Sequence, residues 1–254
     1  MLPTDSFGWI GFLFQQYGSM FLQGAGTTML IAVVGTLAGF GIGLLVAIVR
    51  TIPIEPKDSP AKKVLLKIVR GILIAYIEVF RGTPMMVQAM VIYYGSAILF
   101  GLDMTSLFAA LFIISINTGA YLAEVVRGGI ISVDKGQTEA AHSIGMTHWQ
   151  TMTTIILPQA IRNIMPAIGN EFVINIKDSS VLSIISVSEL FFMTKSAAGT
   201  YYRFFEAFAI ACAIYFVLTF TTTRILLAIE KRMDGPSNYE RYLGQDKERG
   251  GGAL

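Results

Sequence analysis

The sequence predicts an all-α membrane protein that crosses the bilayer about five times. Of its 254 residues, 54% are hydrophobic and only 14% are charged, whereas soluble domains carry about 25% charged residues. Long stretches carry no charge at all: Ser6–Val49, Gly82–Leu102, Met104–Ala123 and Ala207–Thr223. A helix of about 20 mostly apolar residues spans the hydrocarbon core. This composition excludes a soluble enzyme, a secreted disulfide scaffold and a nucleic-acid-binding protein.

The first span is expected at residues 27–49. The stretch before it, residues 6–22, mixes aromatic residues with glutamines and glycines, which suits the membrane interface, so we expect a helix lying on the surface. Three glycines of the span recur every fourth residue: Gly35, Gly39 and Gly43. They share one helical face, where a neighbouring helix can approach closely. The alternative is a glycine-rich face exposed to lipid.

The second span is expected at residues 65–100, with a bend or break at Pro84, because proline supplies no N–H and clashes with the preceding turn. Arg81 or Thr83 can supply hydrogen bonds to the carbonyl groups that the break frees; alternatively, the break opens a gate. Basic residues exceed acidic ones in residues 53–67. The positive-inside rule therefore places this loop in the cytoplasm and the N-terminus outside.

The third span, residues 105–126, returns the chain to the cytoplasm. The next segment, residues 128–162, carries many threonine, glutamine and histidine residues and is too polar for lipid. We expect a cytoplasmic helix-turn-helix that bends at Gly145 and stops near Pro158. The fourth and fifth spans then cover residues 166–192 and 207–229. Basic residues after the fifth span place the C-terminus inside: Lys231, Arg232, Arg241, Lys247 and Arg249.

The fourth span is chemically unusual because it contains Glu171, Lys177, Asp178 and Glu189. Each charged group at the bilayer centre costs about 2.5–3.5 kcal/mol, so these side chains cannot face lipid. Glu171 and Asp178 are seven residues apart and differ by only about 20° around a helix. Three further polar residues lie nearby: Asn170, Ser179 and Ser180. Such a row lines a cavity, a subunit contact or a proton path.

No motif indicates an enzyme or a cofactor. The chain has no Gly-Lys-Ser/Thr triplet for a nucleotide, and His142 and His148 are not spaced like metal ligands. No serine, cysteine or histidine arrangement suggests a nucleophile. Active transport by this chain would therefore need a separate subunit that supplies energy.

The polar segment after the third span contains a spaced motif, in which Glu139-Ala140-Ala141 is followed by Gly145 and by Leu157-Pro158. This spacing resembles the cytoplasmic EAA loop of ABC importer permeases, and the chain looks similar to the polar amino acid permeases of that class. Local similarities agree along the chain: Phe80-Arg81-Gly82-Thr83-Pro84, residues 121–129, Gly136-Gln137, Leu157-Pro158-Gln159-Ala160 and Lys177-Asp178-Ser179-Ser180. The resemblance covers residues 27–232 and implies the type I importer fold, in the histidine/glutamine/arginine group.

The resemblance also implies an assembly in a bacterial cytoplasmic membrane. Such permeases form homodimers or heterodimers, bind two cytoplasmic ATP-binding subunits and receive an amino acid from a solute-binding protein outside. The loop residues Glu139, Ala140, Ala141 and Gly145 would then couple the chain to the ATPase.

For the substrate, we expect the α-ammonium group or a cationic side chain at Glu171 or Asp178, and the carboxylate at Ser179, Ser180 or backbone N–H groups. This favours a basic amino acid. The structural alternative is a buried Lys177–Asp178 pair. The functional alternatives are a proton-coupled or passive transporter without an ATPase, and an intramembrane enzyme.

Overall fold

The computed structural model describes residues 2–54, 56 and 58–233, and this part of the chain forms helices and turns without a strand. In chain order the elements are α1 (Ser6–Thr51), α2 (Pro60–Gly82), α3 (Met85–Phe100), α4 (Ser106–Ser132), α5 (Lys135–Ser143), α6 (His148–Thr151), the π-helical η1 (Met152–Ile156), α7 (Leu157–Asp178), the 3₁₀-helical η2 (Ser179–Ile185), α8 (Leu190–Tyr201) and α9 (Phe204–Met233). The predicted all-α class is confirmed.

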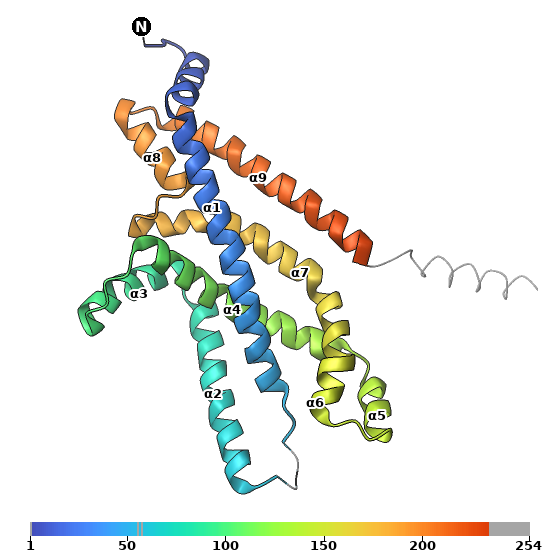
Figure 1. Cartoon of the computed structure of the whole chain (residues 1–254). Helices are drawn as coiled ribbons and strands as arrows, with labels where there is room; N and C mark the ends of the chain where they lie inside the picture. Colours follow the sequence, from blue (N-terminus) through green and yellow to red (C-terminus); the bar gives the residue numbers. More distant parts are fainter. Residues whose placement is uncertain (1, 55, 57, 234–254) are drawn as a thin grey trace, which may run out of the picture.

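The helices α1 and α4 form the central pair of the fold (Figure 1). A Cβ atom added at Gly35, Gly39 or Gly43 would lie 2.6–2.8 Å from an atom of α4, well inside van der Waals contact. The two backbones therefore approach each other along this glycine face. The prediction that the face accepts a neighbouring helix is confirmed, and the lipid-facing alternative is wrong.

The start of α1 differs from the prediction of a helix lying on the membrane surface. Residues 6–22 continue into the first span without a break, giving one helix of 46 residues, about 69 Å long. Trp9, Leu13 and Phe21 are buried in a cluster with residues of α8 and α9. The aromatic residues that suggested a membrane interface pack instead against protein; for example, the Trp9 and Tyr201 ring centroids are 5.5 Å apart.

The region expected as a broken second span consists of two helices. The helix α2 ends at Gly82 and α3 begins at Met85, so the break predicted at Pro84 is confirmed. By length and composition, the described helices provide three spans, α1, α4 and α9, or four if the segment from α6 to η2 and the bent α8 form one. This is fewer than the five expected, because α2 carries many charges and α3, with 16 residues, is only about 24 Å long.

The expected fourth span, residues 166–192, is not one straight crossing. The helix α7 begins before it, at Leu157, and continues through Pro158 and Pro166. Pro158 does not stop the helix because it directly follows the wider π-helical turn η1. After Asp178 the chain tightens into η2 and then bends by 56° into α8.

The two ends of the molecule carry different elements (Figure 1). The end of α1, the start of α2 and the α5–α6 turn lie together at the bottom of the view, whereas the start of α1 and α8 lie at the top. The last turn of α9 contains Lys231 and Arg232. The remaining basic residues used to orient the C-terminus, Arg241, Lys247 and Arg249, lie outside the described residues.

Candidate functional site

The polar segment after α4 folds into two short helices, α5 and α6, joined by a tight turn (Figure 1). The Gly145 N–H donates to the His142 carbonyl (3.0 Å), and the Met146 N–H donates to the Ala141 carbonyl (3.1 Å), which is the Schellman arrangement at a helix end. Gly145 has φ +83°, a conformation that strains residues with a Cβ atom. The predicted bend at Gly145 is confirmed.

The faces of α5 and α6 are unequally covered. Ala141 is buried, whereas Glu139 and Ala140 are exposed. Two large apolar side chains flank the turn, Ile144 at 77% exposure and Trp149 at 63%. The turn therefore presents apolar surface to its surroundings, on the side away from the buried Ala141.

An ion-pair cluster fixes the helix ends beside this element. The Glu124 carboxylate of α4 pairs with Arg50 at the end of α1 and accepts hydrogen bonds from the Arg127 Nε (2.9 Å) and Nη2 (2.8 Å) atoms. A Cβ atom at Gly129 would clash with the Ile164 side chain of α7. The end of α4 is thus held to both α1 and α7. Sequence reasoning missed Glu124, although its three-residue spacing from Arg127 is a signal for such a pair.

The charged row on α7 has the predicted arrangement. Glu171 and Asp178 lie on the same helix, with Glu171 half-buried and Asp178 exposed. Lys177 is exposed as well, and within the described residues no ion pair joins it to a carboxylate. In the single chain, Lys177 and Asp178 therefore do not form a buried ion pair.

The other polar residues expected near these carboxylates are not all available to the same ligand. Asn170 lines a cavity of about 270 Å³ between α7 and α9. Ser179 is buried, and both Ser179 and Ser180 donate their hydroxyl hydrogens to backbone carbonyls three residues earlier, at 2.9 and 2.7 Å. In this conformation their hydroxyl groups can accept hydrogen bonds but do not donate to a carboxylate.

A buried polar junction between the two carboxylates was not anticipated from the sequence. The Asn175 side chain, only 3% exposed, donates to the Thr36 hydroxyl of α1 (2.9 Å) and accepts from the Thr118 hydroxyl of α4 (3.0 Å). Asn175 lies four residues after Glu171 and three before Asp178. It therefore fixes the rotation of α7, and with it the direction of the carboxylate row, against the central α1–α4 pair.

The break between α2 and α3 is stabilised by side-chain amides. The Gln88 side chain donates to the carbonyl groups of Phe80 (3.0 Å) and Thr83 (2.9 Å), and the Asn117 side chain of α4 also reaches Phe80 (3.3 Å). The Thr83 hydroxyl donates to a carbonyl of α2, 2.7 Å away. Thr83 thus takes the expected role, whereas Arg81 lies over the Tyr121 ring.

Glu189, the fourth ionisable residue of the predicted span, has a structural position. It is fully buried and caps α8 by accepting the Phe191 and Phe192 N–H groups at 2.8 and 2.7 Å. The Tyr215 hydroxyl of α9 donates to the same carboxylate at 2.9 Å.

Among the described residues, no group of three or more histidine, cysteine, aspartate or glutamate side chains is placed to hold a metal ion.

The chain thus combines two membrane-length helices that pack together, a polar row on a third helix and a helix-turn-helix at one end. Residues 61–235 match the family described as "Binding-protein-dependent transport system inner membrane component", and the chain belongs to this family. Its curated relatives are permease components of transport systems rather than enzymes.

Two relatives illustrate the similarity. The glutamine transport system permease protein GlnP of Escherichia coli (strain K12) is 34% identical over 215 residues, covering 84% of this chain and 93% of that protein. The arginine transport system permease protein ArtQ of Bacillus subtilis (strain 168) is 33% identical over 214 residues, covering 84% and 91%.

Solved structures agree with the fold. A chain in the crystal structure of an amino acid ABC transporter with histidines is 36% identical and superimposes with a TM-score of 0.76, covering 91% of this chain and 99% of that one. A chain of the inward-facing MetNI methionine ABC transporter shares the fold at 18% identity, with a TM-score of 0.64 and 85% and 99% coverage. The predicted type I importer permease fold is confirmed.

Proposed function

We propose that this chain is the permease subunit of an ATP-driven importer of polar amino acids, with basic ones favoured. Family membership supports the class of substrate, as do the relatives GlnP and ArtQ, which are permeases of glutamine and arginine transport systems. Two ATP-binding subunits, a second permease copy and an extracytoplasmic solute-binding protein complete the assembly in a bacterial cytoplasmic membrane. The chain itself contributes the membrane pathway and no ATPase activity.

The observation that carries the proposal is the preformed turn between α5 and α6. Glu139 and Ala140 are exposed beside Ile144 and Trp149, while Gly145 holds the turn in a left-handed conformation. A surface of this kind can transmit movement because it keeps its shape when a partner pushes on it. We propose that the ATP-binding subunit covers these side chains and that Ala141, buried beneath them, allows close packing onto the rest of the chain.

The substrate contacts are assigned to the open face of α7. Asp178 is exposed in the single chain and Glu171 is half-buried, yet charged groups at membrane depth face a partner or a water-filled cavity rather than lipid. A second permease copy would enclose this face. The two carboxylates then bind the ammonium groups of the substrate, and backbone N–H groups bind its carboxylate, because the Ser179 and Ser180 hydroxyl hydrogens are already donated.

The membrane arrangement follows from the same assignment. Residues 1–254 form one transmembrane domain, with the N-terminus outside, the C-terminus inside and residues 128–162 as the cytoplasmic coupling loop. The broken pair α2–α3 contributes the remaining membrane element. Arg81, Thr83 and Pro84 lie at that break, and the hydrogen bonds to Phe80 and Thr83 support a structural role there over a gate.

The test compares two glycines with left-handed backbones. Gly145 has φ +83° and Gly101 has φ +64°, and an added Cβ atom would meet no neighbour at either position. Gly145→Ala and Gly101→Ala therefore introduce similar backbone strain of about 1–2 kcal/mol. In vesicles containing the permease with its ATP-binding subunits, we expect only Gly145→Ala to reduce substrate-stimulated ATP hydrolysis and uptake.

Glu139→Lys provides an independent variant at an exposed position. We expect it to fold normally and to co-purify with less ATPase than the wild-type chain. Full uptake by Glu139→Lys and Gly145→Ala would refute the coupling role. Uptake by the isolated chain without ATP would instead support a proton-coupled or passive transporter.

A further inference from the structure

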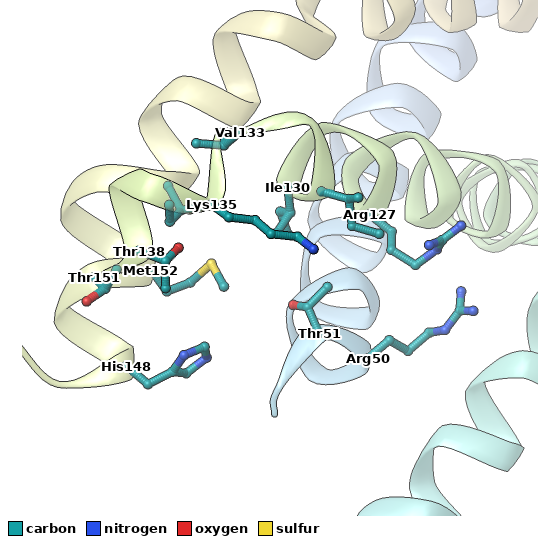
Figure 2. A pocket seen from close by; sticks show the side chains of 12 residues that line it. Arg50, Thr51, Arg127, Ile130, Val133, Lys135, Thr138, His148, Thr151 and Met152 are labelled. Carbon is teal, nitrogen blue, oxygen red and sulfur yellow. The ribbon is translucent and has the colours of Figure 1, made fainter. Parts of the chain in front are cut away.

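A cavity of about 470 Å³ lies between the ends of α1 and α4 and the α5–α6 element (Figure 2). Its polar wall contains the basic side chains of Arg50, Arg127 and Lys135 and the hydroxyl groups of Thr51, Thr138 and Thr151. His148 also lines the cavity, and isoleucine, valine and methionine side chains form the apolar wall. The cavity is separate from the carboxylate row of α7, which supplies none of its lining residues.

The charge of the polar wall is positive. No acidic residue lines the cavity, and the single carboxylate of Glu124 serves both Arg50 and Arg127. Lys135 has no hydrogen bond or ion pair from its ammonium group within the part of the chain that the structure describes. Three formal positive charges therefore face one negative charge, which leaves an excess of two.

The nearby carboxylates do not cancel this excess inside the cavity. Asp134 precedes Lys135 but is not among the lining residues, and its side chain accepts the Gly136 N–H at 2.6 Å. Glu139 is exposed on α5 and does not line the cavity either. Figure 2 shows the Lys135 side chain extending from α5 toward the ends of α1 and α4, with the His148 ring directed toward Thr51 from α6.

We propose that this cavity binds a phosphate-bearing anion and that the source of the phosphate is an anionic phospholipid. Phosphate oxygens accept charge-assisted hydrogen bonds from guanidinium and ammonium groups and ordinary ones from threonine hydroxyls. The polar wall offers these donors together. A cavity of this volume accommodates a small polar headgroup with part of its glycerol unit.

The position of the cavity selects a lipid over a free phosphate ion. The apolar stretch of α1 ends at Arg50, so the cavity lies at the boundary where headgroups meet hydrocarbon. Basic pockets between membrane helices bind the headgroups of anionic lipids. The apolar wall can contact the glycerol unit and the upper acyl chain of a lipid. An inorganic phosphate has no apolar part that could make these contacts.

A bound headgroup would connect α5, through Lys135 and Thr138, with the end of α1, through Arg50 and Thr51. The lipid thereby braces the α5–α6 element against the central helix pair. The effect of this brace on ATPase coupling rests on the proposed function, whereas the binding itself does not.

Binding is tested with the purified full-length chain in a mild detergent. Its thermal unfolding midpoint is measured with added phosphatidylglycerol, with phosphatidylcholine, and with inorganic phosphate at matched ionic strength. We expect a concentration-dependent rise with phosphatidylglycerol alone. An equal rise with both lipids would overturn the proposal, and an equal rise with inorganic phosphate would overturn the lipid as the source.

Variants of two lysines locate the site. Lys135→Gln should weaken the response to phosphatidylglycerol about fivefold, the effect of one basic residue near an anionic membrane surface, and Lys135→Arg should restore it. Lys67→Gln removes an exposed lysine of α2 that does not line the cavity, and should leave the response unchanged. Equal losses for Lys135→Gln and Lys67→Gln would refute this location.

Transport by the complete assembly distinguishes this site from the proposed function. With phosphatidylglycerol in the vesicles, Lys135→Gln should lower substrate-stimulated ATP hydrolysis relative to wild type. If the lipid binds but ATP hydrolysis does not change, the proposed effect of the lipid on the α5–α6 element is overturned, whereas the binding site is not. A chain that transports without an ATPase would overturn the proposed function and leave the lipid site intact.

Discussion

The glycine face of α1, formed by Gly35, Gly39 and Gly43, packs against α4. This packing predicts that alanine substitutions at Gly43 and at the nearby Gly41 change the free energy of unfolding by different amounts. A Cβ atom at Gly43 would lie 2.8 Å from the Ala123 amide nitrogen and 2.9 Å from the Leu122 carbonyl carbon. These are backbone atoms of α4, so they cannot rotate away, and the helices would have to separate by about 0.6 Å to restore an ordinary contact of 3.4 Å. Overpacking of this kind costs about 1–3 kcal/mol.

Gly41 is the matched control, because it lies on the same helix and an added Cβ atom meets no atom within 4 Å. Alanine is favoured over glycine inside a helix by about 1 kcal/mol. This gain is common to both positions, so we expect Gly41→Ala to be neutral or stabilising and Gly43→Ala to be less stable than Gly41→Ala by the overpacking cost, about 1–3 kcal/mol. Unfolding in mixed micelles with increasing denaturing detergent measures this difference. Equal free energies of unfolding for the two variants would refute the close approach of α1 and α4.

Three further predictions concern the polar groups. Glu171→Gln should reduce uptake of cationic amino acids more than that of neutral ones in competition assays; equal losses for both classes would argue against contact with a substrate cation. Asn175→Ala should lower the free energy of unfolding by about 1–3 kcal/mol and also raise KM for uptake, because the rotation of α7 is released; an unchanged KM would limit Asn175 to stability. Tyr215→Phe, which removes the hydrogen bond to Glu189, should cost about 1–2 kcal/mol. Tyr201→Phe should cost less, because Tyr201 packs through its ring, which phenylalanine retains; the reverse order would contradict this assignment.

The sequence predicted the helix-turn-helix of α5 and α6 because its signals are local. The turn at Gly145 depends on one left-handed residue and on backbone hydrogen bonds within residues 141–146. The break at Pro84 is local in the same way, since proline supplies no N–H and clashes with the preceding turn. Pro158 is the counterexample, because the π-helical turn before it lets the helix continue.

Contacts between distant segments could not be predicted in this way. Asn175 forms hydrogen bonds with Thr36, 139 positions earlier in the chain, and with Thr118, 57 positions earlier. Nothing in the local sequence distinguishes Asn175 from the polar residues on either side of it. The start of α1 has the aromatic composition of a membrane interface, but the same side chains pack equally well against α8 and α9. Composition describes which environments a side chain tolerates, and it does not identify the partner that supplies one.

The sequence by itself determined that the protein is helical and lies in a membrane, because scarce charge and long apolar stretches are properties that any fold of the chain must accommodate. It also determined which charged residues need an explanation at membrane depth. Only the tertiary structure decided which of them are satisfied within the chain: Glu189 is enclosed by its helix cap and Tyr215, while Asp178 remains exposed. The physical reason is that burial and hydrogen bonding depend on which helices meet. The packing of side chains and glycines, such as the glycine face of α1 against α4, determines which helices do so.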